Sequence, residues 1–170
     1  MISPAYCRLL AQYGRWMNER MVAALGPVPD HERKRDRGAF FGSIHRTLNH
    51  LVWADATWLA RFTGTRYDAK AYGTELFEDF DELVRERERL DARLLDWAGS
   101  LSDDWLASTI DYRAASDGRL RRLPAWVGAV HLFQHATHHR GQLTTLMRQA
   151  GIDPGVTDLP AMTGVTRVVD

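Results

Sequence analysis

Apolar residues recur every three or four positions over four long stretches of the chain, and this period predicts four amphipathic helices. The stretches run from about residue 4 to 25, 42 to 62, 75 to 98 and 124 to 150. Four such helices form a four-helix bundle when their apolar sides face one another, and bundles build metal sites from side chains on facing helices. The pattern therefore predicts an all-α fold.

Residues with known capping preferences mark the expected helix ends. Ser3 followed by Pro4 is typical of an N-cap with proline at the first helical position. Thr74 is expected to cap the third helix, and Pro124 is expected to open the fourth. The charged segment 30–38 has no helical period, so we interpret it as a solvated loop.

The chain changes character between the third and fourth helices. Segments 109–113 and 119–123 flank the turn pair Asp117–Gly118 and predict a short β-hairpin before the last helix. Two strands alone are only marginally stable, so the hairpin is expected to pack on the helices. Residues 153–170 show no period, and we expect them to be irregular, with part of them over a site or a partner subunit.

Composition narrows the class of protein. A length of 170 residues predicts a single domain spanning residues 1–170. The formal net charge is zero, which gives no reason to expect binding to nucleic acid or to a membrane surface. Cys7 is the only cysteine and no apolar run reaches membrane-spanning length, so a cytoplasmic protein without an internal disulfide is expected.

Four of the seven histidines lie within residues 131–142. His131, His135 and His139 are each four residues apart, so in a helix they lie on one side, one turn above another. Neighbouring imidazoles at this spacing can share one metal ion. The alternative to metal binding is that these histidines are surface or capping residues of the helix. His139 points the same way as the apolar Leu143, and burying imidazoles there without partners would be costly, which favours metal.

A third ligand must come from elsewhere, and the second predicted helix offers His50 among small side chains that let another helix approach. Three histidines would leave coordination positions open for water or substrate, as in catalytic sites. His45 lies on a different side of that helix and is expected to be exposed. Asp55 interrupts the apolar stripe and needs a partner, either a metal-bound imidazole, an arginine or a structural hydrogen bond.

Two motifs together resemble the DinB-like (damage-inducible) family. The first is Ser-Ile-His-Arg-Thr-Leu-Asn-His-Leu at 43–51 with Asp55, and the second is His-Ala-Thr-His-His-Arg-Gly-Gln at 135–142. The resemblance covers nearly the whole chain. It implies a four-helix bundle with a long crossover connection. Proteins of this family often form homodimers, so a homodimer is expected.

The resemblance also implies one divalent metal ion held by three histidines. By position in the two motifs, these are His50, His135 and His139. His131 and His138 do not correspond to ligands. Zinc and nickel are the metals expected for imidazole nitrogens.

Relatives in this family include thiol S-transferases that use bacillithiol and a distant branch of mycothiol-dependent isomerases. The chain is therefore expected to be a metal-dependent enzyme acting on a small molecule, with a low-molecular-weight thiol as a co-substrate. A metal lowers the pKa of a bound thiol and holds the thiolate, and a hydrolytic variant would use hydroxide instead. The alternative is a stress-linked protein that binds a metal or ligand without turnover.

No residue is assigned as a general acid or base. Asp55, Gln142 and His138 are candidates for contacts to a metal ligand or to the substrate, because they lie close to the histidines in the sequence. Ala136 follows the first histidine of the pair, so the zinc-protease motif His-Glu-x-x-His, with its glutamate base, is absent.

Overall fold

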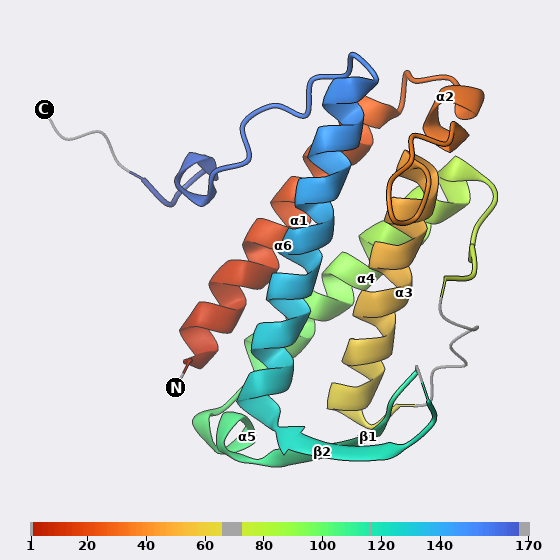
Figure 1. The fold of residues 1–170 in the computed structure, drawn as a ribbon. Coiled ribbons are helices and arrows are strands. Elements are labelled where there is room, and N and C mark those ends of the chain that lie inside the picture. Colours follow the sequence, from red (N-terminus) through yellow and green to blue (C-terminus); the bar gives the residue numbers. More distant parts are fainter. Residues whose placement is uncertain (1, 66–72, 116, 167–170) are drawn as a thin grey trace, which may run out of the picture.

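A computed structural model of the protein describes residues 2–65, 73–115 and 117–166. Its body consists of four long helices, α1 (Pro4–Leu25), α3 (Ile44–Thr63), α4 (Phe80–Ser100) and α6 (Ala125–Gln149) (Figure 1). The smaller elements are α2 (Asp30–Lys34), α5 (Asp103–Ala107), strands β1 (Thr109–Arg113) and β2 (Leu120–Pro124), and a 3₁₀ turn, η1 (Leu159–Ala161). The predicted all-α four-helix bundle is confirmed.

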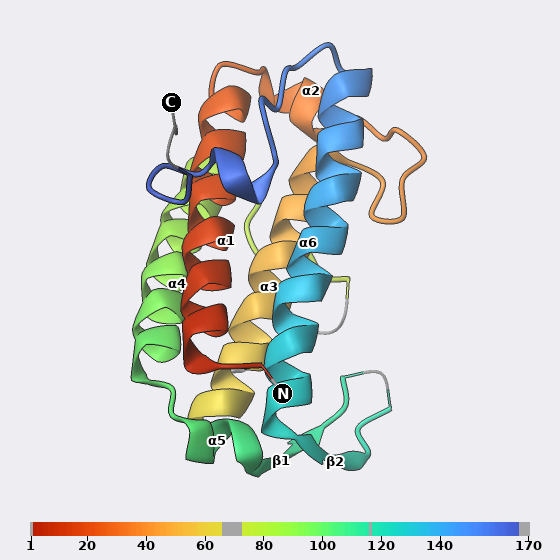
Figure 2. The same cartoon turned by 90° about the vertical axis from the view of Figure 1, so that its left-hand side faces the viewer.

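The order of the helices around the bundle is α1, α4, α3, α6. Helices α1 and α3 each pack on both α4 and α6, and so face each other across the diagonal. Figures 1 and 2 show that α3 and α4 run in the same direction, opposite to α1 and α6. The end of α3 and the start of α4 therefore lie at opposite ends of the bundle, as the long crossover implied by the family resemblance requires.

The core is formed by the apolar sides of the four long helices. Leu25, Ile44, Leu90 and Leu143 are fully buried, one on each helix. Burying a side chain of this size contributes about 1.5–3 kcal/mol. Helix α3 is buried over most of its length and not only along one stripe. Its buried polar side chains, which include His45, Asn49, His50 and Asp55, are therefore held in an environment that excludes water.

The third long helix starts later than its sequence predicts. We expected Thr74 to cap it, but α4 begins at Phe80 and its N-cap is Asp79, whose side chain accepts from the backbone N–H of Glu82. The backbone just before α4 is used differently. The N–H groups of residues 76 and 77 donate to a side chain of α3, which removes them from any helical hydrogen-bond ladder.

The predicted hairpin is confirmed. Strands β1 and β2 pair antiparallel, with Ile110 opposite Leu123, and these two half-buried side chains face the bundle. Gly128 of α6 makes this packing possible. An added Cβ there would lie 3.0 Å from the Phe62 ring and 3.1 Å from the Ile110 side chain. The hairpin therefore closes one end of the bundle.

Two short helices were not predicted. Segment 30–38, expected to be a loop, contains α2, and its buried Arg33 donates to the Leu25 carbonyl at 3.1 Å. Arg33 thus satisfies a carbonyl group that the end of α1 leaves without a helical partner. Helix α5 is capped by Ser102.

The described part of the C-terminal segment leaves the end of α6 and extends to the side of the bundle on which α1 lies (Figure 1). The Tyr13 hydroxyl donates to the Thr157 carbonyl at 2.5 Å. We expected part of this segment to cover a site or a partner; among its described residues Thr157 contacts α1, and contact with a partner subunit stays a prediction. Within the described residues, every helix is too short or too polar to cross a bilayer.

Candidate metal centre

Three histidines from two antiparallel helices converge between α3 and α6. Nε2 of His135 lies 3.3 Å from Nε2 of His50 and 3.1 Å from Nε2 of His139. The three side chains offer ligand atoms that all lie within 4.8 Å of one another. Nitrogens at about 2.0–2.1 Å from a tetrahedral zinc ion would be separated by about 3.3 Å. The geometry of the cluster is therefore consistent with a metal site.

A hydrogen bond sets the orientation of one imidazole. Nδ1 of His139 lies 2.8 Å from Oε1 of Gln142, and a carbonyl oxygen can only accept, so Nδ1 carries the proton. Nε2 of His139 then keeps its lone pair and points it at the cluster. The amide nitrogen of Gln142 lies 3.2 Å from Nε2 of His138, which is exposed. Gln142 thus connects the buried cluster to a surface histidine.

The cluster is poised to bind a cation at neutral pH. Burial lowers the pKa of His50 to about 4 and that of His135 to about 3, and the neighbouring His139 adds to both effects. Burial also lowers the pKa of His139, against the opposing effect of its hydrogen bond to Gln142. Uncharged imidazoles at pH 7 present the lone pairs that a metal needs.

Aromatic rings shield the cluster from water. The Phe41 ring stacks on His50 with centroids 4.0 Å apart and lies 5.4 Å from the His139 ring. Trp53, one turn after His50 on α3, also stacks on the His50 ring, with centroids 5.9 Å apart. Electrostatic interactions are stronger in such a water-poor environment than at an open surface.

A cavity of about 520 Å³ opens beside His50. Its wall consists of the loop 36–42, the α3 residues Arg46, His50 and Trp53, and the crossover residues 73–75. Small-molecule sites occupy cavities of roughly 300–1,000 Å³. The cavity is therefore large enough for a small molecule in contact with one of the three imidazoles.

The other predicted residues have different surroundings. Oδ2 of Asp55 accepts from Nη1 of Arg87 at 2.8 Å in the core, so of the partners considered for Asp55 the structure shows an arginine. His131 is exposed and packs against the Trp58 ring at 4.8 Å. Its ring lies 5.4 Å from that of His135, so His131 is next to the cluster. It is not one of the three clustered histidines, His50, His135 and His139, which form the triad.

The prediction that His45 is exposed is wrong. Its side chain is fully buried, and Nε2 lies 2.8 Å from the Phe77 carbonyl and 3.2 Å from Oε1 of Glu75. The crossover folds over this side of α3, a long-range contact that helical periodicity does not reveal. His45 therefore holds the crossover against α3.

Asn49 has a function that the sequence reasoning missed. Its Oδ1 accepts from the backbone N–H groups of Leu76 and Phe77, at 2.8 and 2.9 Å, and its Nδ2 donates to the Phe77 carbonyl at 3.1 Å. One feature of the sequence could have indicated this function: an amide side chain directly precedes His50, and apolar residues of the helix flank the pair. Asn49 and His45 together fix the segment that forms one wall of the cavity.

A buried charged network lies near the cluster. Arg87 contacts Asp55 of α3 through Nη1 and Asp91 of α4 through Nη2, each at 2.8 Å. Asn18 of α1 donates to Asp91 at 3.0 Å, and Arg140 of α6, the residue after His139, is buried and attracts Asp55. Burial alone would lower the pKa of Arg87, but the carboxylates of Asp91 and Asp55 raise it by more. The pKa of Arg87 therefore lies above its usual value, and the guanidinium stays charged. The network connects all four long helices.

Replacing Gln142 by leucine is expected to weaken zinc binding by about 10–100-fold, the usual cost of losing a hydrogen-bond partner of a ligating histidine. Leucine cannot accept from Nδ1 of His139, so the imidazole loses its fixed tautomer and orientation. Competition with a chelator of known affinity measures the effect. Gln134→Leu, at an exposed position of the same helix, is the matched control. Equal affinities in the two variants would rule out this function of Gln142.

A four-helix bundle in which two antiparallel helices bring three imidazoles together belongs to the class of helical bundles with a histidine cluster between facing helices, an arrangement consistent with a metal site. Within that class, the family model described as DinB family matches residues 1–166, and the chain belongs to the DinB family. The resemblance seen in segments 43–51 and 135–142 is thereby confirmed.

Individual relatives agree with this assignment. Protein DinB of Bacillus subtilis is 28% identical over 153 residues, which cover 88% of each chain. Uncharacterized protein YrdA of the same organism is 40% identical over 58 residues, or 34% of each chain. The crystal structure of a DinB-like protein from Bacillus cereus has a TM-score of 0.60 and 21% identity, and covers 83% of this chain and 91% of that chain. That structure shows the same fold.

Proposed function

We propose that the protein is a metal-dependent enzyme that transfers a low-molecular-weight thiol to a small electrophile. The observation that supports this function best is the convergence of three imidazole nitrogens beside a cavity of about 520 Å³. A structural zinc site usually has four protein ligands, whereas a catalytic site has three and an open position. The triad, as found among the described residues, fits the second pattern.

His50, His135 and His139 would hold one divalent cation, and zinc or nickel suits their nitrogens. Three neutral imidazoles do not compensate the double positive charge, which favours an anionic group in the open position. When bound, the metal lowers the pKa of a thiol and so supplies the thiolate, which is the reactive form, at neutral pH.

The residues of the chain would position the reactants and exclude water. Phe41 and Trp53 shield His50, and the cavity wall orients the thiol. The thiol proton leaves to solvent, and the sulfur electron pair forms a bond to the electrophilic carbon. A haloalkyl carbon loses its halide with the bonding pair, whereas an unsaturated carbonyl takes up a proton from solvent at its α-carbon. This sequence requires no oxidant or reductant.

The surroundings of the triad favour thiol transfer over hydrolysis. Activating water usually calls for a nearby general base, and Asp55 is already paired with Arg87 in the core. Glu75 on the cavity wall contacts His45 and Arg46. A thiolate, once formed, needs no such base.

The test is conjugation by the metal-loaded protein. Zinc- or nickel-loaded protein is incubated with cysteine, bacillithiol, mycothiol or glutathione and with haloalkyl and unsaturated carbonyl electrophiles, and conjugates are followed by mass spectrometry. Conjugates are expected with at least one thiol, at a rate well above that of the His139→Ala variant. Full metal loading without conjugation across the panel would instead favour a non-catalytic metal or ligand carrier.

A further inference from the structure

The cavity beside His50 has charges of both signs on its wall, and these charges restrict the ligand more than the metal site does. Arg46 precedes His50 by one turn of α3, and both line the cavity. Four residues of helix advance about 6 Å, so the guanidinium and the imidazole bracket a short molecule. Asp36 and Glu75 line the same cavity from the loop before α3 and from the crossover.

Arg46 is suited to recognise a carboxylate. Its side chain is 66% exposed, and its Nε lies 3.4 Å from Oε2 of Glu75. A guanidinium has five N–H donors in one plane, so it can contact Glu75 and still form paired hydrogen bonds to a second carboxylate. Because Arg46 is anchored to the crossover through Glu75, its position on the cavity wall is restrained.

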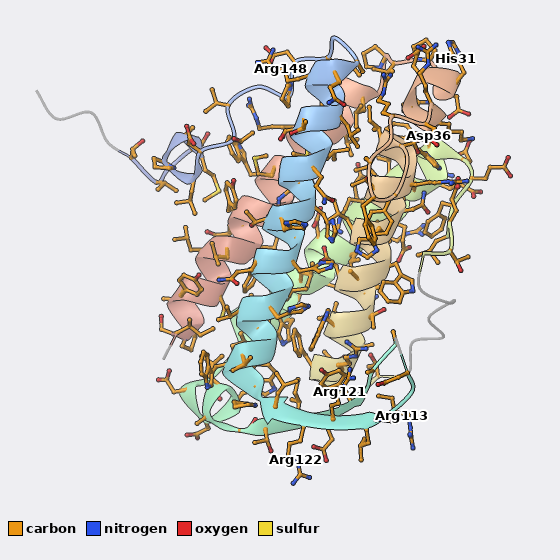
Figure 3. All side chains as sticks on the ribbon, in the orientation of Figure 1. His31, Asp36, Arg113, Arg121, Arg122 and Arg148 are labelled. Carbon is orange, nitrogen blue, oxygen red and sulfur yellow. The ribbon has the colours of Figure 1, made fainter. Side chains whose placement is uncertain are left out.

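The acidic side chains are also held in place. Oδ1 of Asp36 accepts from the Gly38 backbone N–H at 2.9 Å, and Oε1 of Glu75 lies 3.2 Å from Nε2 of the buried His45. Gly42, whose φ of +80° favours glycine, lies close to one charge of each sign. A Cβ there would lie 3.6 Å from Asp36 Oδ1 and 4.0 Å from Arg46 Nη1. Figure 3 shows Asp36 on the loop beside the start of α3.

This distribution of charge argues against ligands of a single sign. A phosphate or a dicarboxylate would meet Arg46 favourably but would be repelled by Asp36 and Glu75. A simple amine would be attracted to the acids but repelled by Arg46 and by a cation at the triad. A molecule with a carboxylate, an ammonium group and a thiol satisfies all of these groups at once.

We propose that the cavity binds the amino-acid head group of a cysteine-type thiol. Its carboxylate would contact Arg46, its ammonium group would contact Asp36 and Glu75, and its sulfur would point toward the three histidines. This proposal rests on the proposed function, because it assumes that the triad receives the sulfur. It adds the chemical class of the thiol.

The probes are three thiols of similar size binding to zinc-loaded protein. Cysteine has both charged groups, 3-mercaptopropionate lacks the ammonium group, and cysteamine lacks the carboxylate. Isothermal titration is expected to give cysteine an affinity at least about 10-fold higher than either analogue, equivalent to about 1.4 kcal/mol for each charged contact. Equal affinities for the three thiols would overturn the proposal.

Substitutions of the charged residues test which side chain gives the preference for cysteine. Arg46→Gln is expected to remove most of the preference for cysteine over cysteamine, while zinc content and the circular dichroism spectrum stay unchanged. Arg148→Gln is the matched control, since Arg148 is also 66% exposed and forms one ion pair, at the C-terminal end of α6 and outside the lining of the cavity. Asp36→Asn with Glu75→Gln is expected to remove the preference over 3-mercaptopropionate. Preferences that persist in these variants would contradict the assignment.

Binding and turnover separate this proposal from the transferase function. Selective binding of cysteine without conjugation would contradict the transferase function and support the head-group site. Conjugation at equal rates with all three thiols would do the reverse.

Discussion

Alanine in place of His50 or His139 is expected to reduce bound zinc from about one ion per chain to almost none. Each substitution removes one of three ligands, and direct ligands matter more than their hydrogen-bond partners, whose loss already costs about 10–100-fold in affinity. The affinity should therefore fall by more than about 100-fold. Each variant is dialysed against a weak chelator, and its zinc content is then measured by elemental mass spectrometry.

His131→Ala is the matched control for these two variants. It removes a histidine of α6, the helix that carries His139. The ring of His131 lies 5.4 Å from that of His135, but His131 is outside the triad. Its zinc content should equal that of the wild type. Full loading of both His50→Ala and His139→Ala, with helical content retained, would exclude the triad as a metal site.

Replacing Arg87 by methionine is expected to lower the free energy of unfolding by about 3–5 kcal/mol, the usual cost of breaking a buried ion pair from one side. Methionine fills most of the space but leaves Asp55 and Asp91 buried without their cation. Urea denaturation followed by circular dichroism measures the change.

Two further variants test the cause of this loss. Arg85→Met replaces an exposed arginine two residues earlier on the same helix and should change stability by less than about 0.5 kcal/mol. Adding Asp55→Leu to Arg87→Met removes one of the two stranded carboxylates and should recover part of the loss. If Arg87→Met were as stable as Arg85→Met, the network would not contribute to stability.

The sequence predicted the long helices because their apolar period extends over many turns, and it predicted the hairpin because a turn pair joins two short strands. The spacing of His135 and His139 indicated a metal pair for the same local reason. The position of His50 beside that pair depends on α3 and α6 being neighbours. Periodicity does not specify neighbours, so the family resemblance supplied this part.

Long-range contacts explain what the sequence did not predict. The crossover buries His45 and uses the backbone of residues 76–77 as a partner for Asn49, which delays the start of α4. Helix α2 exists in a charged segment because Arg33 folds back on carbonyls at the end of α1. The identity of the metal, the thiol and the homodimer stay predictions.

The hydrogen bonds from Asn49 to the crossover have a consequence for how specificity can diverge. His50 of the histidine cluster and Asn49, which helps to fix one cavity wall, are consecutive on α3, so any tilt of that helix moves both together. Loop 36–42 forms the opposite wall from a separate, solvent-facing segment. Changes in the length or composition of this loop can therefore alter which molecules fit the cavity while the positions of the three histidines are preserved.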